Sequence, residues 1–350
     1  MIHFECDYNE GAHERVLAML KETNSLQTKG YGEDEFCEKA AAQIRELCRA
    51  PHVQVHFMVG GTQANAAVID AALRPYQGVL SAHTGHIAAH ETGAIEAGGH
   101  KVLSLAAVDG KITAKQIAAA VEEHRADASF EHTVQPGMVY LSSPTEMGTV
   151  YSLAELQEIS RTCREKDLIL FLDGARLGYG LTARGADVTL SALAALCDVF
   201  TIGGTKGGAL FGEAIVIGNP AIAKDFRYLI KQHGGMLAKG RLLGIQFLAL
   251  LEENLWLSLA EKANEQACRI KESFCAAGMT FAVETPTNQQ FPILTKQQAD
   301  FLAARYGFLQ IEKLEGGSIV CRFCTSWASR DEDVTALIAD IQRAAILPER

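Results

Sequence analysis

The sequence predicts an α/β protein with a mostly parallel sheet covered by helices and a smaller α+β domain at the C-terminal end. Short apolar runs alternate with longer helical patterns between residues 53 and 217, which is typical of βαβ units. Some of these runs, such as residues 168–172, are almost continuously apolar, as expected for strands buried on both faces. After about residue 240 the alternation stops, which indicates a second architecture.

The predicted elements of the sheet region follow in chain order. Residues 1–45 are expected to form an arm and one helix ahead of the sheet. Strands are predicted at residues 53–59, 78–81, 101–105, 138–142, 168–172, 198–202 and 214–217. Helices are predicted at residues 62–73, 87–96, 113–124 and 152–166. Ser152 and Glu155 form a capping box at the start of the last of these helices.

The C-terminal region predicts a different order of elements. A long helix over residues 242–277 precedes short strands, and a helix over residues 331–345 closes the chain. The strands are predicted at residues 280–283, 291–294, 308–312 and 318–323. We therefore expect an N-terminal arm and helix (1–45), a large α/β domain (46–240) and a small α+β domain (241–350). No Pro-rich linker separates them, so they are expected to pack closely.

Composition excludes several classes of protein. With 32 basic and 42 acidic side chains the net charge is −10, so nucleic acid is not expected as a partner. The best apolar stretch, residues 242–251, is shorter than the ~18 residues a membrane span needs and runs into Glu252 and Glu253. The scattered cysteines and the absence of a secretory start favour a cytoplasmic protein with reduced thiols. Cys321 and Cys324 lie on a predicted strand, so we interpret them as buried structural cysteines.

A glycine-rich turn follows the first predicted strand of the sheet. Gly60, Gly61 and Thr62 open the helix that comes next. Free N–H groups at a helix start bind anions, so a phosphate site is one interpretation. A plain glycine turn with Thr62 as N-cap is an equal alternative, because neither standard nucleotide fingerprint is present.

Two charged residues lie at the ends of later predicted strands. Asp173 ends the apolar strand of residues 168–172, where ligands bind in parallel sheets, although it could also cap a helix. Lys206 follows the strand of residues 198–202 and has two glycines on each side. A lysine placed there can form a Schiff base once its pKa is lowered, and a flexible glycine loop is the alternative. An anion site, a strand-end aspartate and a strand-end lysine, in this order, are what pyridoxal 5′-phosphate requires.

The chain resembles the low-specificity L-threonine aldolases, in the β-eliminating lyase group of fold-type I pyridoxal-phosphate enzymes. The similarity spans essentially the whole length and is carried by five blocks: Tyr31-Gly32-Glu33-Asp34, Gly61-Thr62-Gln63-Ala64-Asn65, His86 with Glu91 and Gly93, Asp173-Gly174-Ala175-Arg176, and Lys206-Gly207, with Arg322 on a late strand. The resemblance implies cleavage of L-threonine, allo-threonine and related β-hydroxy-α-amino acids to glycine and an aldehyde. Racemisation, β-elimination and a non-catalytic oligomer that keeps the fold are the alternatives.

The resemblance also implies a role for individual residues. Lys206 would hold the cofactor, Asp173 its ring nitrogen, and Gly61 and Thr62 its phosphate. His86 would stack on the ring, while Arg176 and Arg322 would bind the substrate carboxylate. A homodimer or homotetramer is implied, with active sites at the dimer interface, where Tyr31 and residues 231–235 are expected to reach a neighbouring subunit's site.

The chain departs from this family pattern at three positions. Thr205 precedes the lysine where a serine is usual, and Cys6 replaces an early serine near the substrate carboxylate, beside Asp7. Glu146 stands in the loop after residues 138–142, where many members carry a histidine near the substrate hydroxyl. Glu146 and His86 are therefore the two candidates for the catalytic base.

A metal site is the remaining alternative for one cluster of histidines. His83, His86 and His90 could share one helix face, as metal ligands would. The zincin pattern requires Glu directly after the first His, whereas Glu91 follows the last one. We therefore expect no metal, with His86 on the cofactor and the other two in structural roles.

Overall fold

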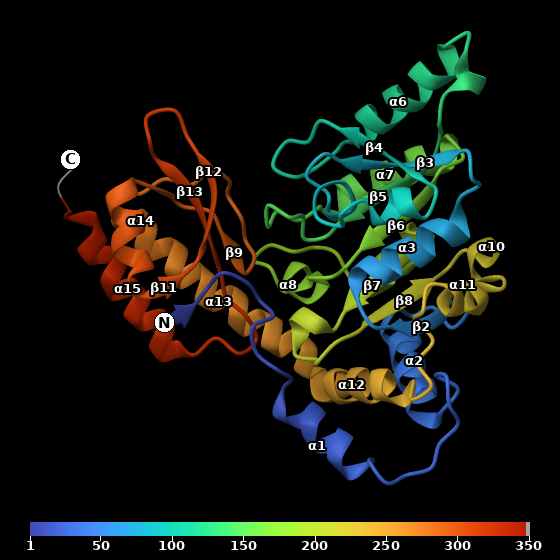
Figure 1. The fold of residues 1–350 in the computed structure, drawn as a ribbon, viewed down its shortest axis with the longest axis horizontal. Helices are drawn as coiled ribbons and strands as arrows, with labels where there is room; N and C mark the ends of the chain where they lie inside the picture. The colour runs from blue at the N-terminus through green and yellow to red at the C-terminus, as the bar shows by residue number, and fades with distance from the viewer. Residues whose placement is uncertain (348–350) are drawn as a thin grey trace.

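The computed structural model describes residues 1–347 and is built around one seven-stranded sheet (Figure 1). The strands lie in the order β2-β8-β7-β6-β5-β3-β4, and only β8 runs antiparallel to its neighbours. Their bounds are β2 Gln54–Met58, β3 Gln77–Ala82, β4 Lys101–Leu105, β5 Gln135–Ser142, β6 Ile169–Asp173, β7 Val199–Gly203 and β8 Glu213–Ile217. All seven predicted strands are confirmed.

Helices cover both faces of this sheet, because successive side chains of each strand point to opposite faces. Val139, Leu141 and Leu170 belong to one apolar cluster, and Met138, Tyr140 and Phe171 belong to another. On the first face, the helices that contribute side chains to the cluster are α2 Glu35–Leu47, α6 Ala114–Ala126, α7 Leu153–Glu165, α9 Leu190–Leu196 and α12 Arg241–Leu251. On the opposite face, the helices that contribute side chains to the second cluster are α3 Gly61–Ala72, α4 His86–Ala89, α5 Ala94–Ala97, α10 Pro220–Ala223 and α11 Phe226–Gln232.

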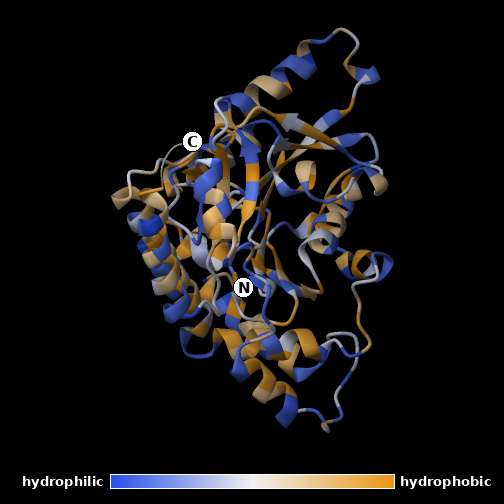
Figure 2. Cartoon of the chain, turned by 60° about the vertical axis from the view of Figure 1, so that its left-hand side comes forward, coloured by the Kyte–Doolittle hydropathy of each residue, from blue (hydrophilic) through white to orange (hydrophobic). Residues whose placement is uncertain are grey.

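A smaller α+β unit lies beside the large sheet. Its four-stranded sheet contains β9 Gln289–Gln290, β10 Ile293–Leu294, β12 Leu309–Lys313 and β13 Ile319–Cys324, and the helices α13 Leu255–Ala276, α14 Lys296–Ala303 and α15 Asp331–Ala345 pack around it. The chain start belongs to the same unit, because β1 Ile2–His3 pairs with β11 Tyr306–Gly307 and Phe4 is buried in its core. In Figure 2, orange hydrophobic residues run through the strands, while the outer helices carry blue hydrophilic residues.

The structure differs from the prediction in three helical regions. Two helices precede the sheet instead of one, α1 Glu14–Glu22 and α2. The predicted helix over residues 87–96 is divided into α4 and α5, because Thr92 and Gly93 adopt positive φ angles of 54° and 70°. The predicted helix over residues 242–277 is divided into α12 and α13, because Glu253 and Asn254 adopt positive φ angles of 52° and 60°.

The segment Arg241–Ala276 is long and apolar enough to cross a membrane by length and composition alone, since one 18-residue stretch of it has a mean hydropathy of 1.3. The sequence expectation that no stretch reaches this length was therefore wrong by that criterion. The segment is two helices, however, and Phe247, Leu248 and Leu250 of α12 are buried in the core against the large sheet. Burial inside the protein accounts for its apolar character.

Two C-terminal predictions also need correction. Residues 280–283 form no strand; Phe281 makes only an isolated bridge to Pro292. Residues 291–294 contribute only the short β10, next to the short β9. Because α12 packs on α2 while β1 pairs with β11 of the small unit, we propose that the small unit begins at the break around Glu253 and includes the first four residues.

Candidate active site

A cavity of about 250 Å³ opens at the edge of the large sheet where β2, β5, β6 and β7 end and β8 begins. Three larger hollows occur elsewhere within residues 1–347, but none of the three is lined by Asp173 or Lys206, the strand-end charges that the sequence singled out. The predicted residues among those that line it are Gly61, Thr62, His86, Glu146, Asp173, Arg176 and Lys206. The structure therefore brings seven of the ten predicted site residues to one place, from segments up to 145 positions apart (61 to 206).

The start of α3 forms one wall of the cavity. Gly60 is the N-cap of this 12-residue helix and provides no side-chain hydrogen bond to it. Thr62 was an alternative N-cap in the sequence, but it lies inside the helix and lines the cavity. An uncapped helix start bordering a cavity suits an anion, since its backbone N–H groups lack helical partners.

Asp173 lies at the end of β6 and is held by three hydrogen bonds. Its Oδ2 accepts from Asn65 Nδ2 at 2.9 Å and from the Tyr140 hydroxyl at 2.6 Å. Its Oδ1 accepts from the backbone N–H of Ala175 at 2.8 Å. Burial, and then the nearby Asp173, raise the pKa of Tyr140 well above its usual range, so this hydroxyl stays a donor. The carboxyl group is fixed in orientation at the cavity wall.

His86 belongs to the same network of buried polar groups. Its Nδ1 lies 2.8 Å from Oε1 of the buried Glu91, and Asn65 Nδ2 donates to the same oxygen at 2.8 Å. Asn65 therefore links Glu91 to Asp173. This arrangement orients the His86 ring and leaves its other nitrogen free to face the cavity.

Lys206 lies in a short 3-10 turn directly after β7, and its side chain lines the cavity. The flanking glycines are required sterically: a Cβ on Gly207 would come within 2.8 Å of the Trp256 ring, and Gly208 has a φ of 106°. The Tyr179 hydroxyl donates to the Lys206 carbonyl at 2.6 Å and fixes the turn. Burial and the adjacent Arg176 lower the pKa of the Lys206 amine, which favours its neutral, nucleophilic form.

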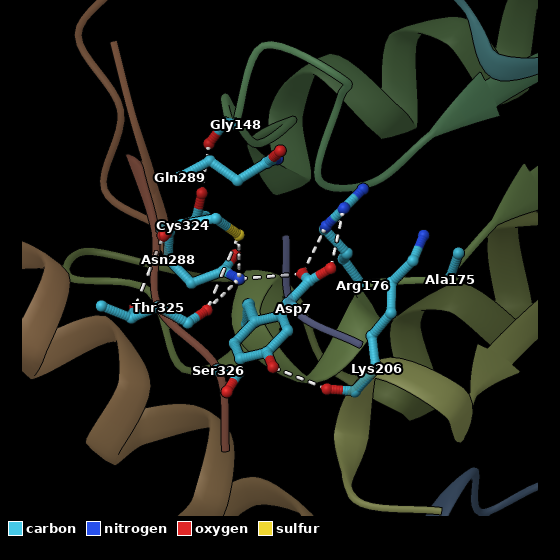
Figure 3. Close-up of polar contacts among 12 residues, drawn as sticks. Asp7, Gly148, Ala175, Arg176, Lys206, Asn288, Gln289, Cys324, Thr325 and Ser326 are labelled. Carbon is cyan, nitrogen blue, oxygen red and sulfur yellow. Dashed lines mark hydrogen bonds and ion pairs between the residues drawn. The ribbon is translucent and has the colours of Figure 1, made fainter. Parts of the chain in front are cut away.

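Arg176 is held by a bidentate ion pair with Asp7 (Figure 3). Its Nε and Nη2 donate to Asp7 at 2.7 and 2.9 Å, and Asn288 Nδ2 donates to Asp7 at 2.9 Å. Burial would raise the pKa of Asp7, but the charges of Arg176 and Lys206 lower it to about 2. Nη1 of Arg176 has no partner within residues 1–347, so one N–H edge of the guanidinium is available to an anion.

Glu146 lies in the loop between β5 and α7 and lines the cavity. Ser142 donates to its Oε1 at 2.6 Å, whereas its Oε2 is buried without a partner in the described chain. Burial raises the pKa of Glu146, although the Ser142 hydrogen bond opposes this. A carboxylate with a raised pKa is a stronger base than a free glutamate.

Three predicted site residues do not line this cavity. Cys6 is buried with its Sγ 2.9 Å from Asn9 Oδ1, and Arg322 on β13 donates to the Glu5 carbonyl at 3.0 Å. Tyr31 lies at a separate surface hollow, half-exposed, with the Lys231 ammonium 5.2 Å from its ring centre. Within one chain, the site is therefore formed without these three side chains.

The three histidines considered as metal ligands act separately. His83 accepts a hydrogen bond from the backbone of Ala107, His86 contacts Glu91, and His90 lies beside His86 with ring centres 5.8 Å apart. Within residues 1–347, no group of three or more His, Cys, Asp or Glu side chains is arranged to hold a metal ion.

Sequence reasoning missed four buried residues of the site: Asn65, Glu91 and Tyr140 in the Asp173 network, and Glu213 at the start of β8. Asn65 and Glu91 occur in the matched blocks but were given no role. A glutamate at the start of an otherwise apolar strand was the one available signal for Glu213. Tyr140 carries no signal in an apolar strand, since only the fold brings its hydroxyl to Asp173.

The residues of the cavity fit pyridoxal phosphate. An uncapped helix start suits the phosphate, a fixed carboxylate suits a protonated ring nitrogen, and a lysine with a lowered pKa suits the aldehyde. Together with the sheet order, the fold and the site define a fold-type I pyridoxal-phosphate enzyme. An aspartate aminotransferase from Thermus thermophilus has the same fold, with a TM-score of 0.72 at 14% identity over 98% of this chain and 91% of that one.

Comparison with other known proteins identifies the particular family. The beta-eliminating lyase family matches residues 13–297. A low-specificity L-threonine aldolase from Pseudomonas aeruginosa is 32% identical over 97% of this chain and 96% of its own length. A threonine aldolase from Leishmania major superimposes with a TM-score of 0.96 at 41% identity, covering 99% of this chain and all of that one. The chain belongs to the beta-eliminating lyase family, in the group that includes the low-specificity L-threonine aldolases.

Proposed function

We propose that this protein cleaves L-threonine, L-allo-threonine and related β-hydroxy-α-amino acids to glycine and an aldehyde, using pyridoxal 5′-phosphate. The observation that carries the proposal is the placement of Asp173 and Lys206 at the ends of the adjacent strands β6 and β7, in one cavity beside the start of α3. The similarity to threonine aldolases over nearly the whole chain supports it.

The cofactor would be held from four directions. Gly61 and Thr62 would bind the phosphate, Asp173 the ring nitrogen and Lys206 the aldehyde carbon, with His86 against the ring. When bound, pyridoxal phosphate supplies an electron sink for a bond broken at Cα of an amino acid. The hydrogen bonds from Asn65 and Tyr140 keep the Asp173 carboxyl aimed into the cavity without rearrangement.

Arg176 would bind the substrate carboxylate through its free Nη1 edge, because Asp7 fixes the rest of its guanidinium. Arg322 would contribute from β13, and Cys6 would lie nearby. In this chain Arg322 does not line the cavity, and its Nη2 donates to the Glu5 carbonyl at 3.0 Å.

Glu146 would act as the base at the substrate β-hydroxyl. Its Oε2 lies buried without a partner, so it can accept the hydroxyl proton as the Cα–Cβ bond breaks and the aldehyde leaves. His86 is the second candidate, because Glu91 holds its ring in place.

We further propose a cytoplasmic homodimer or homotetramer with active sites at the dimer interface. Tyr31, half-exposed and remote from the cavity of its own chain, supports this, because a residue of the matched motif would otherwise have no place in the site. Tyr31 and residues 231–235 would reach the site of the neighbouring subunit.

Product analysis tests the proposed reaction. The purified protein with pyridoxal phosphate should release glycine and acetaldehyde in equal amounts from L-threonine. A 2-oxo acid with ammonia would indicate elimination, and D-allo-threonine without aldehyde would indicate racemisation at Cα. If no amino acid is turned over and no cofactor binds, the protein is a non-catalytic oligomer.

A further inference from the structure

Glu213 is a buried carboxyl group at the cavity to which the proposed reaction assigns no role. It is the first residue of β8, where its Cα pairs with Met58 at the end of β2 and with Gly203 at the end of β7. The chain continues from Met58 into the uncapped start of α3, and from Gly203 into the turn that carries Lys206. Glu213 therefore lies between the expected phosphate site and the lysine.

The environment of Glu213 is unusual for a carboxyl group. Glu213 is only 3% exposed, and its side chain lines the cavity. Its Oε2 is buried with no hydrogen-bond partner within residues 1–347. A buried carboxylate without partners is strongly disfavoured, because it loses its hydration without any compensation. The group therefore either is neutral or awaits a ligand that is absent from the protein alone.

The charges around Glu213 decide between its two protonation states. The charged groups that act on it are Asp173 from β6 and Lys206 from the turn after β7, while the residues paired with it on β2 and β7 are uncharged. Burial and Asp173 raise the pKa of Glu213 well above its ordinary range, and Lys206 only partly opposes this. The raised pKa and the buried, unpartnered Oε2 both favour the neutral form of this carboxyl group.

A protonated carboxylic acid is a hydrogen-bond donor, whereas an ionised one would repel a phosphate. Buried acids kept neutral in this way donate to anionic groups in other enzymes. The start of α3, whose backbone N–H groups suit an anion, borders the same cavity as Glu213. The Glu213 carboxyl group, as a donor, and the place expected for a phosphate, as an acceptor, therefore lie on one wall of the site.

We propose that Glu213 is a cofactor-binding residue that donates a hydrogen bond from its neutral carboxyl group to the phosphate of the cofactor at the start of α3. This inference rests on the proposed function, because it requires the phosphate to bind at that wall. The phosphate would then have a further donor besides the backbone N–H groups of the helix. This donor is present only while the Glu213 side chain is protonated.

The test measures the affinity of the cofactor-free full chain for pyridoxamine 5′-phosphate and for pyridoxamine. Neither compound has an aldehyde, so covalent attachment to Lys206 does not contribute to binding. The ratio of the two affinities therefore isolates the contribution of the phosphate group. Glu213→Ala should weaken the binding of pyridoxamine phosphate by about ten-fold to a hundred-fold, the range for one hydrogen bond to a charged group. The affinity for pyridoxamine should stay unchanged. Glu213→Gln, which stays neutral and keeps a donor, should bind both within a few-fold of the parent.

The pH dependence separates this role from a purely structural one. In the parent protein, affinity for pyridoxamine phosphate should fall as pH rises from neutral into the alkaline range, because Glu213 ionises beside the phosphate. Glu213→Gln should lose this alkaline fall, while the matched control Glu158→Gln, an exposed glutamate on α7, should keep it. Because Gln preserves the shape, this comparison remains decisive even if Glu213→Ala does not fold.

Two results would overturn the inference without touching the proposed function. One is an alkaline fall that persists unchanged in Glu213→Gln; the other is an unchanged ratio of the two affinities in a folded Glu213→Ala variant. A parent protein that binds pyridoxamine phosphate no more tightly than pyridoxamine has no phosphate site. That outcome would overturn the proposed function itself.

Discussion

At the scale of single residues, burial moves several groups of the cavity away from their usual charge states. It raises the pKa of Glu146 and of Glu213, and together with Arg176 it lowers that of Lys206. Asp7 is the exception, because its ion pair with Arg176 lowers its pKa to about 2 despite complete burial. Such perturbed groups around one cavity are typical of catalytic sites.

The first prediction concerns the charge of Asp173. Asp173→Asn keeps the shape of the side chain but removes its negative charge, so a bound pyridine nitrogen would lose its proton. We expect kcat to fall by several orders of magnitude, an electrostatic loss of ~3–4 kcal/mol or more. Steady-state kinetics with L-threonine measure this, and a near-normal kcat would reduce Asp173 to a structural residue at the end of β6.

The second prediction concerns Glu146 as the base. The base is active when ionised, and burial raises its pKa, so kcat should rise with pH through a value above the ~4.3 of a free glutamate. Glu146→Gln should lower kcat by roughly 10²–10⁴-fold, remove this acidic limb and leave cofactor affinity unchanged. A pH–rate profile identical in parent and variant would transfer the role to His86 or a bound water.

At the scale of elements, most of the sheet could be predicted because its strands are apolar runs between helical periodicities. The breaks within helices could not be predicted in this way. Glu253 and Asn254 lie in the left-handed region without a glycine to mark the turn, whereas at Thr92 the following Gly93 was the one local signal of a break. The short strands β9, β10 and β11 have two residues each, and at that length pairing partners decide the structure more than the local sequence does.

The third prediction concerns the capping box of α7, which the sequence predicted and the structure confirms. Ser152 accepts a hydrogen bond from the Glu155 N–H at 3.2 Å, and Glu155 accepts one from the Ser152 N–H at 2.7 Å. Ser152→Ala should lower the free energy of unfolding by about 0.5–2 kcal/mol. Urea unfolding at fixed protein concentration measures this. Ser25→Ala, at an exposed serine in the loop after α1, is the control, and equal stability of the two variants would contradict the prediction.

At the scale of the whole molecule, the site is a product of the fold. The strand-end residues Asp173 and Lys206 could be found from the sequence, because buried strands in α/β proteins place their ends at one edge. The ion pair between Asp7 and Arg176 could not, since 169 positions separate its members and nothing local to either indicates the pairing. Glu213 required the position of the antiparallel strand β8, which only the assembled sheet defines.

The fourth prediction concerns contributions between subunits. Tyr31→Ala and Lys206→Ala should each form oligomers of low activity. If Tyr31 acts in the neighbouring subunit's site, co-expression should restore roughly a quarter of the parent activity, because half of randomly paired dimers are hybrids with one intact site. Differently tagged chains allow the hybrids to be purified and assayed. Hybrids as inactive as their parents would place Tyr31 in the site of its own chain.

The central claim is that the cofactor attaches to Lys206, and peptide mapping tests it most directly. The purified protein is incubated with pyridoxal phosphate, reduced with borohydride and digested, and the labelled peptide is identified by mass spectrometry. We predict a single label on Lys206, and none in Lys206→Ala, because within residues 1–347 only this amine lines the cavity, and its pKa is lowered. A label on Lys231 or Lys239 in the parent protein, with Lys206 unmodified, would contradict the account.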